Sequence, residues 1–175
     1  MKTVQLKKHK VDGWQYLTKN ITLIKPLVLV FGNRFMLEND NVYKEIKAFY
    51  PDGHIVFGST SGDITSAGVD DNSITVTAVE FEKSKFLIKN SNLLSSNLDS
   101  FKTGVNLVNQ FPKEGLKYIF VLSDGSFVNG SELTNGMNST TENNILITGG
   151  LCGDAARFEK TLASYNENPK PGEII

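Results

Sequence analysis

Tyr118-Ile119-Phe120-Val121-Leu122 runs directly into the polar turn Ser123-Asp124-Gly125. An uninterrupted apolar run that ends in such a turn is typical of a strand buried on both faces of a sheet. Two further runs of this kind, at residues 54–57 and 145–148, also end in glycine-bearing turns. Because ligands of open α/β sheets bind at the carboxyl ends of the strands, we expect the three turns to share one site.

Helical patterns alternate with these strands. Val42, Ile46 and Phe49 recur at the spacing of one helix face, and Asn39 or Asp40 is placed to cap the start of that helix. With the flanking strands, which we expect at 27–31 and 54–57, this helix has the length of a βαβ unit.

The middle of the chain predicts a different kind of strand. Residues 73–81 alternate in polarity and are rich in β-branched side chains, a pattern typical of a strand with one covered face. Residues 86–88 are expected to pair with it through a turn at Lys83 and Ser84. Residues 158–165 are expected to form a last strand.

Two further helices are expected over residues 97–110 and 131–138. The sequence therefore predicts the α/β class, as a single domain with a mixed β-sheet flanked by two or three helices. We expect this domain to span residues 27–166. It would follow an N-terminal segment, 1–26, and precede a tail or linker, 167–175, that contains two prolines.

Composition excludes several classes of protein. The 175 residues are 39% hydrophobic and 21% charged, which is an ordinary globular balance. The formal net charge of −1 provides no bulk attraction for nucleic acid or for an anionic membrane. The first twenty residues contain no apolar signal core, and the single cysteine, Cys152, favours a reducing compartment. We expect a cytoplasmic protein with no nucleic-acid or membrane partner.

The three turns carry groups that suit a small zwitterion such as an amino acid. Hydroxyls and N–H groups of a glycine-flanked loop can hold a carboxylate, and so can the free N–H groups at the start of a helix. Asp124 at a strand end can bind an ammonium group. The candidate ligand-binding residues are Ser59, Thr60, Ser61, Gly62, Asp124, Asn129, Ser131, Gly149, Gly150 and Asp154.

Structural roles are the alternatives for several of these residues. Asn129 or Ser131 can cap the helix expected at 131–138, and Asp154 can form an ordinary ion pair with Arg157. The glycines at 149 and 150 can serve a tight turn and close strand packing.

Catalytic chemistry finds little support in the sequence. The stretch 58–62 resembles a nucleophile elbow with Thr60 at its centre, but a β-branched residue resists that geometry and no histidine follows His54. Cys152 lacks an evident base. A possible metal trio lacks EF-hand spacing and a matching glutamate; its members are Asp63, Asp70 and Asp71. We expect no enzyme, no bound metal and no cofactor.

The order of these motifs resembles the N-terminal half of the FIST domain family. The resemblance covers roughly residues 27–166, and its motifs are specific in combination. The matching segments are residues 27–32, 55–64, 71–76, 120–125, 129–133 and 149–158. The family motif at the first turn usually carries a cysteine, and this sequence has none there.

The resemblance implies an intracellular sensory module of bacteria or archaea. Such a module would bind a small polar ligand, for example an amino acid, and would signal to a FIST C-terminal half or to another signalling protein. Because some relatives bind haem, a haem-based nitric-oxide sensor is an alternative. A third reading is a structural half of a two-part FIST protein, since the C-terminal half is absent from this sequence.

Overall fold

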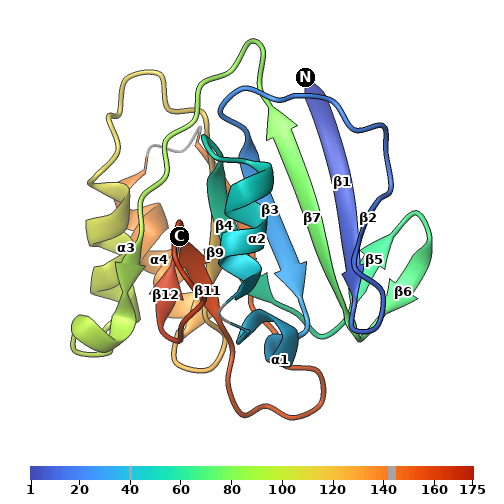
Figure 1. Cartoon of the computed structure of the whole chain (residues 1–175). Helices are drawn as coiled ribbons and strands as arrows, with labels where there is room; N and C mark the ends of the chain where they lie inside the picture. Colours follow the sequence, from blue (N-terminus) through green and yellow to red (C-terminus); the bar gives the residue numbers. More distant parts are fainter. Residues whose placement is uncertain (40, 142–144) are drawn as a thin grey trace.

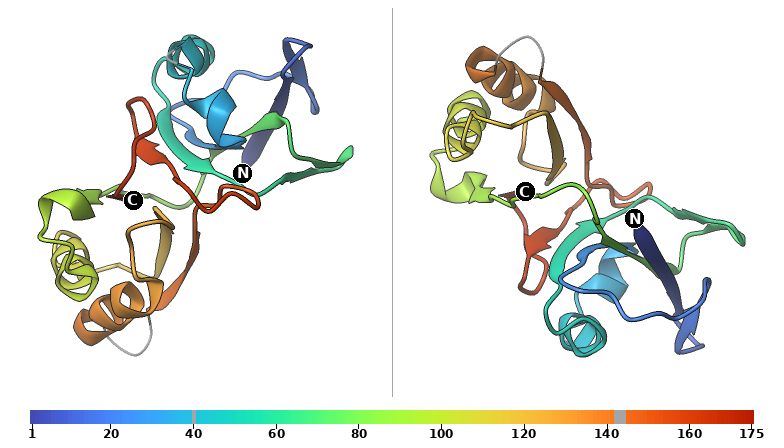
Figure 2. Two further views of the ribbon diagram at one scale, coloured as in Figure 1. Left: turned by 90° about the horizontal axis from the view of Figure 1, so that it is seen from below. Right: turned by 90° about the horizontal axis from the view of Figure 1, so that it is seen from above.

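The computed structural model describes residues 1–39, 41–141 and 145–175. Two larger sheets form two lobes, and each lobe carries helices on its outer face (Figure 1). A two-stranded hairpin, β5 (Asp63–Thr65) with β6 (Gly68–Asp70), projects from the first lobe. The last residues of the chain lie between the lobes (Figure 2).

The first sheet has six strands in the order β11-β4-β3-β7-β1-β2. Parallel β3 and β4 are joined through the one-turn helix α1 (Arg34–Leu37) and through α2 (Asn41–Phe49). The strands are β1 (Lys2–His9), β2 (Trp14–Tyr16), β3 (Leu27–Gly32), β4 (His54–Ser59), β7 (Ser73–Glu80) and β11 (Ala163–Tyr165).

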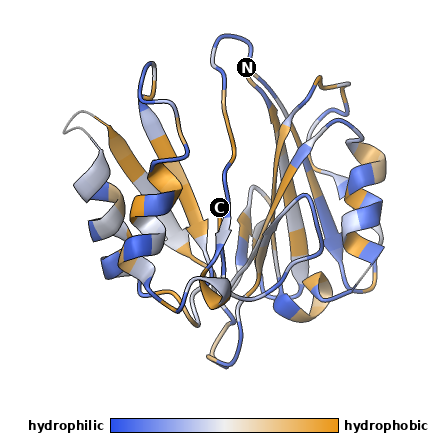
Figure 3. Cartoon of the chain, turned by 90° about the vertical axis from the view of Figure 1, so that its left-hand side faces the viewer, coloured by the Kyte–Doolittle hydropathy of each residue, from blue (hydrophilic) through white to orange (hydrophobic). Residues whose placement is uncertain are grey.

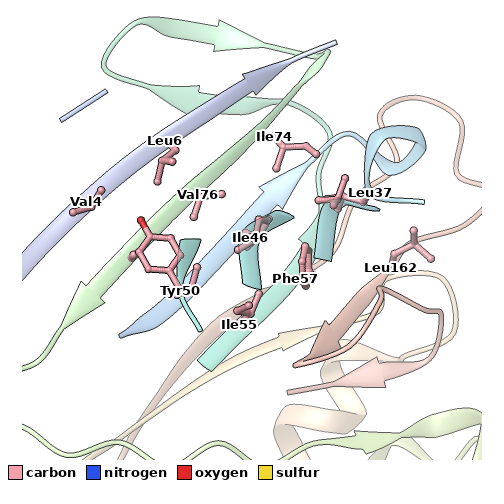
Figure 4. Packing of buried hydrophobic residues seen from close by; sticks show 14 residues of the cluster. Val4, Leu6, Leu37, Ile46, Tyr50, Ile55, Phe57, Ile74, Val76 and Leu162 are labelled. Carbon is pink, nitrogen blue, oxygen red and sulfur yellow. The ribbon is translucent and has the colours of Figure 1, made fainter. Parts of the chain in front are cut away.

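The core of the first lobe lies between this sheet and α2. Alternate residues of β3, Val28 and Val30, are fully buried, and they meet Ile46 of α2 in the same cluster. Phe57 of β4 is the largest side chain without exposure in the cluster (Figure 4). Burial of this apolar face is the main force that holds α2 to the sheet.

The second sheet has four strands in the order β10-β9-β12-β8. Parallel β9 and β10 are joined by α4, which packs with α3 over one face, and the strands beside these helices are largely hydrophobic (Figure 3). The elements are β8 (Ser91–Asn92), the 3-10 turn η1 (Leu93–Ser95), α3 (Ser100–Val108), β9 (Tyr118–Ser123), α4 (Gly130–Thr140), β10 (Leu146–Leu151) and β12 (Glu173–Ile174). A Cβ at Gly104 would collide with the Leu133 carbonyl, so glycine permits the close approach of the two helices.

Residues 152–175 join the two lobes. The Cys152 N–H donates to the Ser123 carbonyl at 2.7 Å, and the Gly153 N–H donates to the Ser59 carbonyl at 2.8 Å. β11 then pairs with β4 of the first sheet, and β12 enters the second sheet between β9 and β8. A small apolar cluster fills the junction: Val56, Leu122, Cys152, Ala163 and Ile175.

The predicted α/β class and the mixed strand pairing are confirmed. The described residues contain four α-helices, because the single turn α1 is too short to show a helical pattern in the sequence. The main helices and strands fall where they were expected, within a few residues. Asn39 accepts a hydrogen bond from the Asn41 N–H at 3.0 Å, whereas Asp40 lies outside the described residues.

Four expectations about the chain's course are wrong. Residues 86–88 lie outside any strand, and β7 pairs instead with β1 and β3. The N-terminal segment 1–26 supplies β1 and β2 of the first sheet, and only Ala163–Tyr165 of the expected last strand is a strand. Residues 167–175 are no linker, because they include the buried strand β12.

Candidate functional site

The second lobe contains a cavity of about 330 Å³ between α4 and the carboxyl-terminal halves of β9 and β10. This is the position at which ligands bind to parallel α/β sheets. The first half of α4 forms one wall, and the two strands form the other. The lining residues are Val121, Ser123, Gly130, Leu133, Thr134, Ile147, Thr148, Gly149, Gly150 and Leu151.

Two adjacent glycines make room for the cavity in β10. Gly149 has a φ of +152°, and a Cβ there would collide with the Val121 carbonyl oxygen. Glycine is therefore required at this position to keep β10 against β9. Gly150 differs, because a Cβ at this residue would meet no atom within 4 Å. That open space lies on the face of the sheet turned away from α4, because Gly150 pairs with Leu122 of β9, whose side chain packs in the junction between the lobes.

The walls of the cavity are uncharged. Its apolar side chains are Val121, Leu133, Ile147 and Leu151. Its side-chain polar atoms are the hydroxyls of Ser123 and Thr134, because the Thr148 side chain lies on the opposite face of the sheet. This composition fits a pocket that is mainly apolar and has a few hydrogen-bonding groups.

Most of these hydroxyl protons already have acceptors in the protein. The Thr134 hydroxyl lies 2.8 Å from the Gly130 carbonyl, and the Ser123 hydroxyl lies 3.2 Å from the Asp124 carbonyl. The Thr148 hydroxyl is in contact with the Tyr118 hydroxyl. What the Ser123 and Thr134 hydroxyls still offer a ligand is lone pairs, which accept hydrogen bonds.

The start of α4 forms one end of the cavity. The Asn129 side chain caps the helix by accepting from the Glu132 N–H at 3.2 Å, as its structural alternative predicted. Gly130 lines the cavity, whereas Ser131 and Asn129 are exposed.

The Asp124 carboxylate forms hydrogen bonds within the turn that follows β9. This side chain is fully buried, and its Oδ1 accepts from the N–H groups of Ser126 at 2.8 Å and Phe127 at 2.7 Å. Its Oδ2 accepts from the Thr161 hydroxyl at 2.9 Å. Both carboxylate oxygens are therefore occupied by groups of the chain itself.

The first turn is likewise engaged within the protein. The Ser59 Oγ accepts from the Leu162 N–H at 2.9 Å, and the Thr60 hydroxyl donates to Asp63 at 2.8 Å. Ser61 packs closely against Gly153, and Gly62 has a φ of +136°. Ser59 and Ser61 thus connect the end of β4 to the segment that joins the lobes.

Asp154 is the centre of a buried ionic cluster. Its Oδ1 accepts from Arg34 Nε at 2.9 Å and from Arg157 Nη2 at 2.7 Å. Burial alone would raise the pKa of Asp154, but the hydrogen bonds from Arg157 and Arg34 outweigh it and hold this pKa below its usual value. The predicted ion pair with Arg157 is present.

The three predicted turns do meet, but around residues 152–162 rather than around an open site. Of the ten predicted ligand-binding residues, only Gly149 and Gly150 line the cavity. The sequence pattern missed its remaining walls, although two signals point to them. Val121 and Ser123 alternate along β9, while Gly130, Leu133 and Thr134 share one face of α4.

Potential catalytic and metal-binding groups lie outside the cavity. Burial and the nearby Asp124 carboxylate raise the pKa of Cys152 to about 12, so this thiol is protonated at neutral pH. Within the described parts of the chain, no three His, Cys, Asp or Glu side chains cluster as a metal site would require. Asp63 accepts from the Ser73 hydroxyl at 2.9 Å, and Asp70 instead contacts Lys7 and His9, each at 3.2 Å.

The cavity does not fit a haem. An axial haem ligand is normally His, Cys, Met or Tyr, and none of these residue types lines the cavity. His54 begins β4 in the first lobe, where its Nδ1 is 2.7 Å from the Tyr165 hydroxyl.

Comparison with protein families identifies the type of domain. The FIST N domain model matches residues 26–175. The chain belongs to the FIST family. FIST domains are sensory domains, which gives the chain a general sensory role. No curated protein and no solved structure matches it.

The match to the FIST N domain begins just before β3, so β1 and β2 lie outside it although they complete the first sheet. In the described residues, no helix has both the length and the apolar character needed to cross a membrane.

Proposed function

We propose that this FIST domain binds a small organic molecule in the cavity between α4, β9 and β10 and passes the signal to a partner. The cavity is the observation that carries the proposal. It lies at the carboxyl ends of two parallel strands and has a size in the lower part of the range found for ligand pockets, about 300–1,000 Å³. The sensory character of the family supports the same role.

The proposal places recognition in a different part of the molecule from the polar turns. The side chains at these turns form hydrogen bonds within the protein, as Asp124, Ser59 and Asp154 do. Gly149 and Gly150 remain as contact residues, together with the aliphatic walls. Amino acids and similar polar metabolites are the ligands that the family resemblance implies, and the experiment below includes them.

Signal transmission would use β10. In the described chain β10 pairs only with β9, and most of its residues are exposed. An edge strand with few buried side chains lies at the low-stability end of a fold, so a bound ligand that bridges it to α4 would order it. Ligand binding would thereby make β10, the exposed edge strand of the second sheet, more rigid.

The partner would contact the face of the second sheet that is turned away from the helices. Tyr118, Phe120 and Leu146 expose large apolar surfaces there. A FIST C-terminal half or a signalling protein would cover them. In an intact signalling protein, Phe120→Lys should leave ligand binding unchanged and abolish the ligand-dependent output. An unchanged output would remove this face from the proposal.

We further propose that the domain is not an enzyme. The cavity walls carry no acid, base or thiolate, and these groups are the usual agents of proton transfer and nucleophilic attack. Incubation of the protein with each bound compound should therefore return that compound unchanged.

The test is an NMR titration of the full 175-residue chain against a panel of small metabolites that includes the amino acids. A ligand should shift amide signals of residues 121–123, 130–134 and 147–151 and leave those of 58–62 in place. Thr134→Phe should suppress the response by filling the cavity from its α4 wall. Ser131→Phe is the matched control, because Ser131 is exposed on the same helix and does not line the cavity. Shifts centred on 58–62, or no response to any compound, would refute the proposal.

A further inference from the structure

The walls of the α4 cavity restrict the charge of its ligand. No lining side chain is ionisable, and four of them are aliphatic. The cavity is open to solvent along β10, and a zwitterion that enters it between the strands and α4 would gain no charged partner for either of its two charges. Burial of an unpaired charge is among the most costly events in protein binding.

Charges near the cavity do not compensate for this. Asp124, at the end of β9, is fully buried, accepts three hydrogen bonds from the chain itself and does not line the cavity, so an incoming ammonium group does not reach it. The closest acidic residue along α4, Glu132, is exposed and does not line the cavity. Arg34 and Arg157 are paired with Asp154. A carboxylate and an ammonium group would both lack a partner.

The hydroxyls of the wall favour a ligand that donates a hydrogen bond. The Thr134 proton is directed to a carbonyl of its own helix, and the Ser123 proton is directed to the Asp124 carbonyl. Their remaining lone pairs accept, so a ligand N–H or O–H finds a partner there.

The volume sets the size of the ligand. An apolar cavity of about 150 Å³ holds one benzene molecule. A cavity of about 330 Å³ has roughly twice that space. It would therefore hold a molecule of about 10–15 non-hydrogen atoms, such as a bicyclic aromatic compound.

We infer that the cavity between α4, β9 and β10 binds a neutral, mainly apolar molecule of bicyclic size that carries one hydrogen-bond donor. Free amino acids are excluded from it by their two charges. This inference rests on the proposed function and specifies the ligand of the same site.

Indole and L-tryptophan form a matched pair of probes, because they share a ring system and differ in the charged amino-acid group. Calorimetric titration of the full chain should show indole binding more tightly than tryptophan by a factor of about ten or more. Thr134→Phe should weaken indole binding by a similar factor, and Ser131→Phe should not.

A second probe tests the hydrogen bond. 1-Methylindole lacks the N–H donor, so it should bind several-fold more weakly than indole. Thr134→Val removes an acceptor, and it should reduce the preference for indole over 1-methylindole. Equal binding of the two indoles would overturn the assignment of a donor.

The outcomes separate the two proposals. Tryptophan binding as tightly as indole, with loss of binding in Thr134→Phe, would overturn the neutral ligand and keep the sensory cavity. Failure of indole, tryptophan and the metabolite panel to bind would overturn both. Indole binding that survives Thr134→Phe unchanged would place its site elsewhere and would also overturn the inference.

Discussion

The two lobes are built from the same unit but use it differently. In the first lobe, β3, α2 and β4 form a parallel pair with a crossover helix, and in the second lobe β9, α4 and β10 do the same. β4 lies inside its sheet, and five of its six residues are buried. β10 lies at an edge, and most of its residues are exposed.

The difference between the units depends on side-chain volume at matching positions. In the first unit Val30 of β3 is opposite Phe57, which fills the space beneath α2. In the second unit Val121 of β9 is opposite Gly149, and the cavity occupies the corresponding region. The interior of the first lobe is therefore filled by side chains that stabilise the fold, whereas the second lobe leaves space for a ligand.

The largest expected effect compares the two interiors directly. Phe57→Ala should lower the free energy of unfolding by about 3–5 kcal/mol, because it empties a closed core. Leu151→Ala in the wall of the cavity should cost less than about 1 kcal/mol, since Leu151 is already 51% exposed. Urea denaturation of both variants measures the contrast. Equal losses would mean that the second interior is packed as firmly as the first.

The ionic cluster of the first lobe comes next. Asp154→Asn should cost about 3 kcal/mol at pH 7, because it removes the buried carboxylate beside Arg34 and leaves this buried guanidinium only its pairs with Glu159 and Glu38, which are more exposed.

The pH dependence of stability tests the same carboxylate. Because the folded-state pKa of Asp154 is lowered, its contribution is present above the unfolded pKa, about 3.9, and is lost as the pH falls through the folded value. Wild type and Asp154→Asn should therefore converge in stability under acid conditions. A constant difference between pH 7 and pH 3 would contradict the lowered pKa.

A smaller effect is expected at the start of α4. Asn129→Ala removes the cap on the Glu132 N–H and should cost about 1 kcal/mol. Asp99→Ala, at the matching position of α3, is the natural comparison because Asp99 accepts from the Lys102 N–H at 2.9 Å. If the α4 variant alone also alters ligand affinity, the start of α4 belongs to the binding site.

The smallest effect on stability should come from Gly150→Val. Open space surrounds its Cβ position, and we expect a change within about 0.5 kcal/mol. Ligand binding should be retained, because the added side chain would lie on the face of the sheet turned away from α4. A large loss of stability in thermal unfolding would show that this face is covered.

Much of this fold follows from local pattern. The apolar run at residues 118–122 correctly predicts strand β9, and the stripe of Val42 and Ile46 predicts the buried face of α2. The expected burial of β9 on both faces is wrong, because Tyr118 and Phe120 are exposed. β12 could not be predicted in this way, because its two residues are too few to show a period and their partners are remote in sequence. The apolar triplet 86–88 misled for the opposite reason: Phe86 packs on His54, 5.2 Å between ring centres, without joining a sheet.

The candidate site was harder to predict than the fold. The hydrogen bonds from Ser126 and Phe127 to Asp124 are local and follow the usual behaviour of aspartate in turns. Thr161, which completes the coordination of Asp124, is 37 residues away. Sequence alone could not show that such a distant donor binds the second carboxylate oxygen, and so the turns looked available to a ligand.

The position of β12 also determines the order in which parts of the structure can form during synthesis. Its Glu173 accepts a hydrogen bond from Asn90, 83 residues earlier, and the carbonyl of the same residue accepts from the Asp124 N–H. On the ribosome, β8, β9 and β10 emerge well before these residues. The second sheet therefore stays incomplete until Glu173 and Ile174 have emerged, whereas β3 and β4 can pair much earlier.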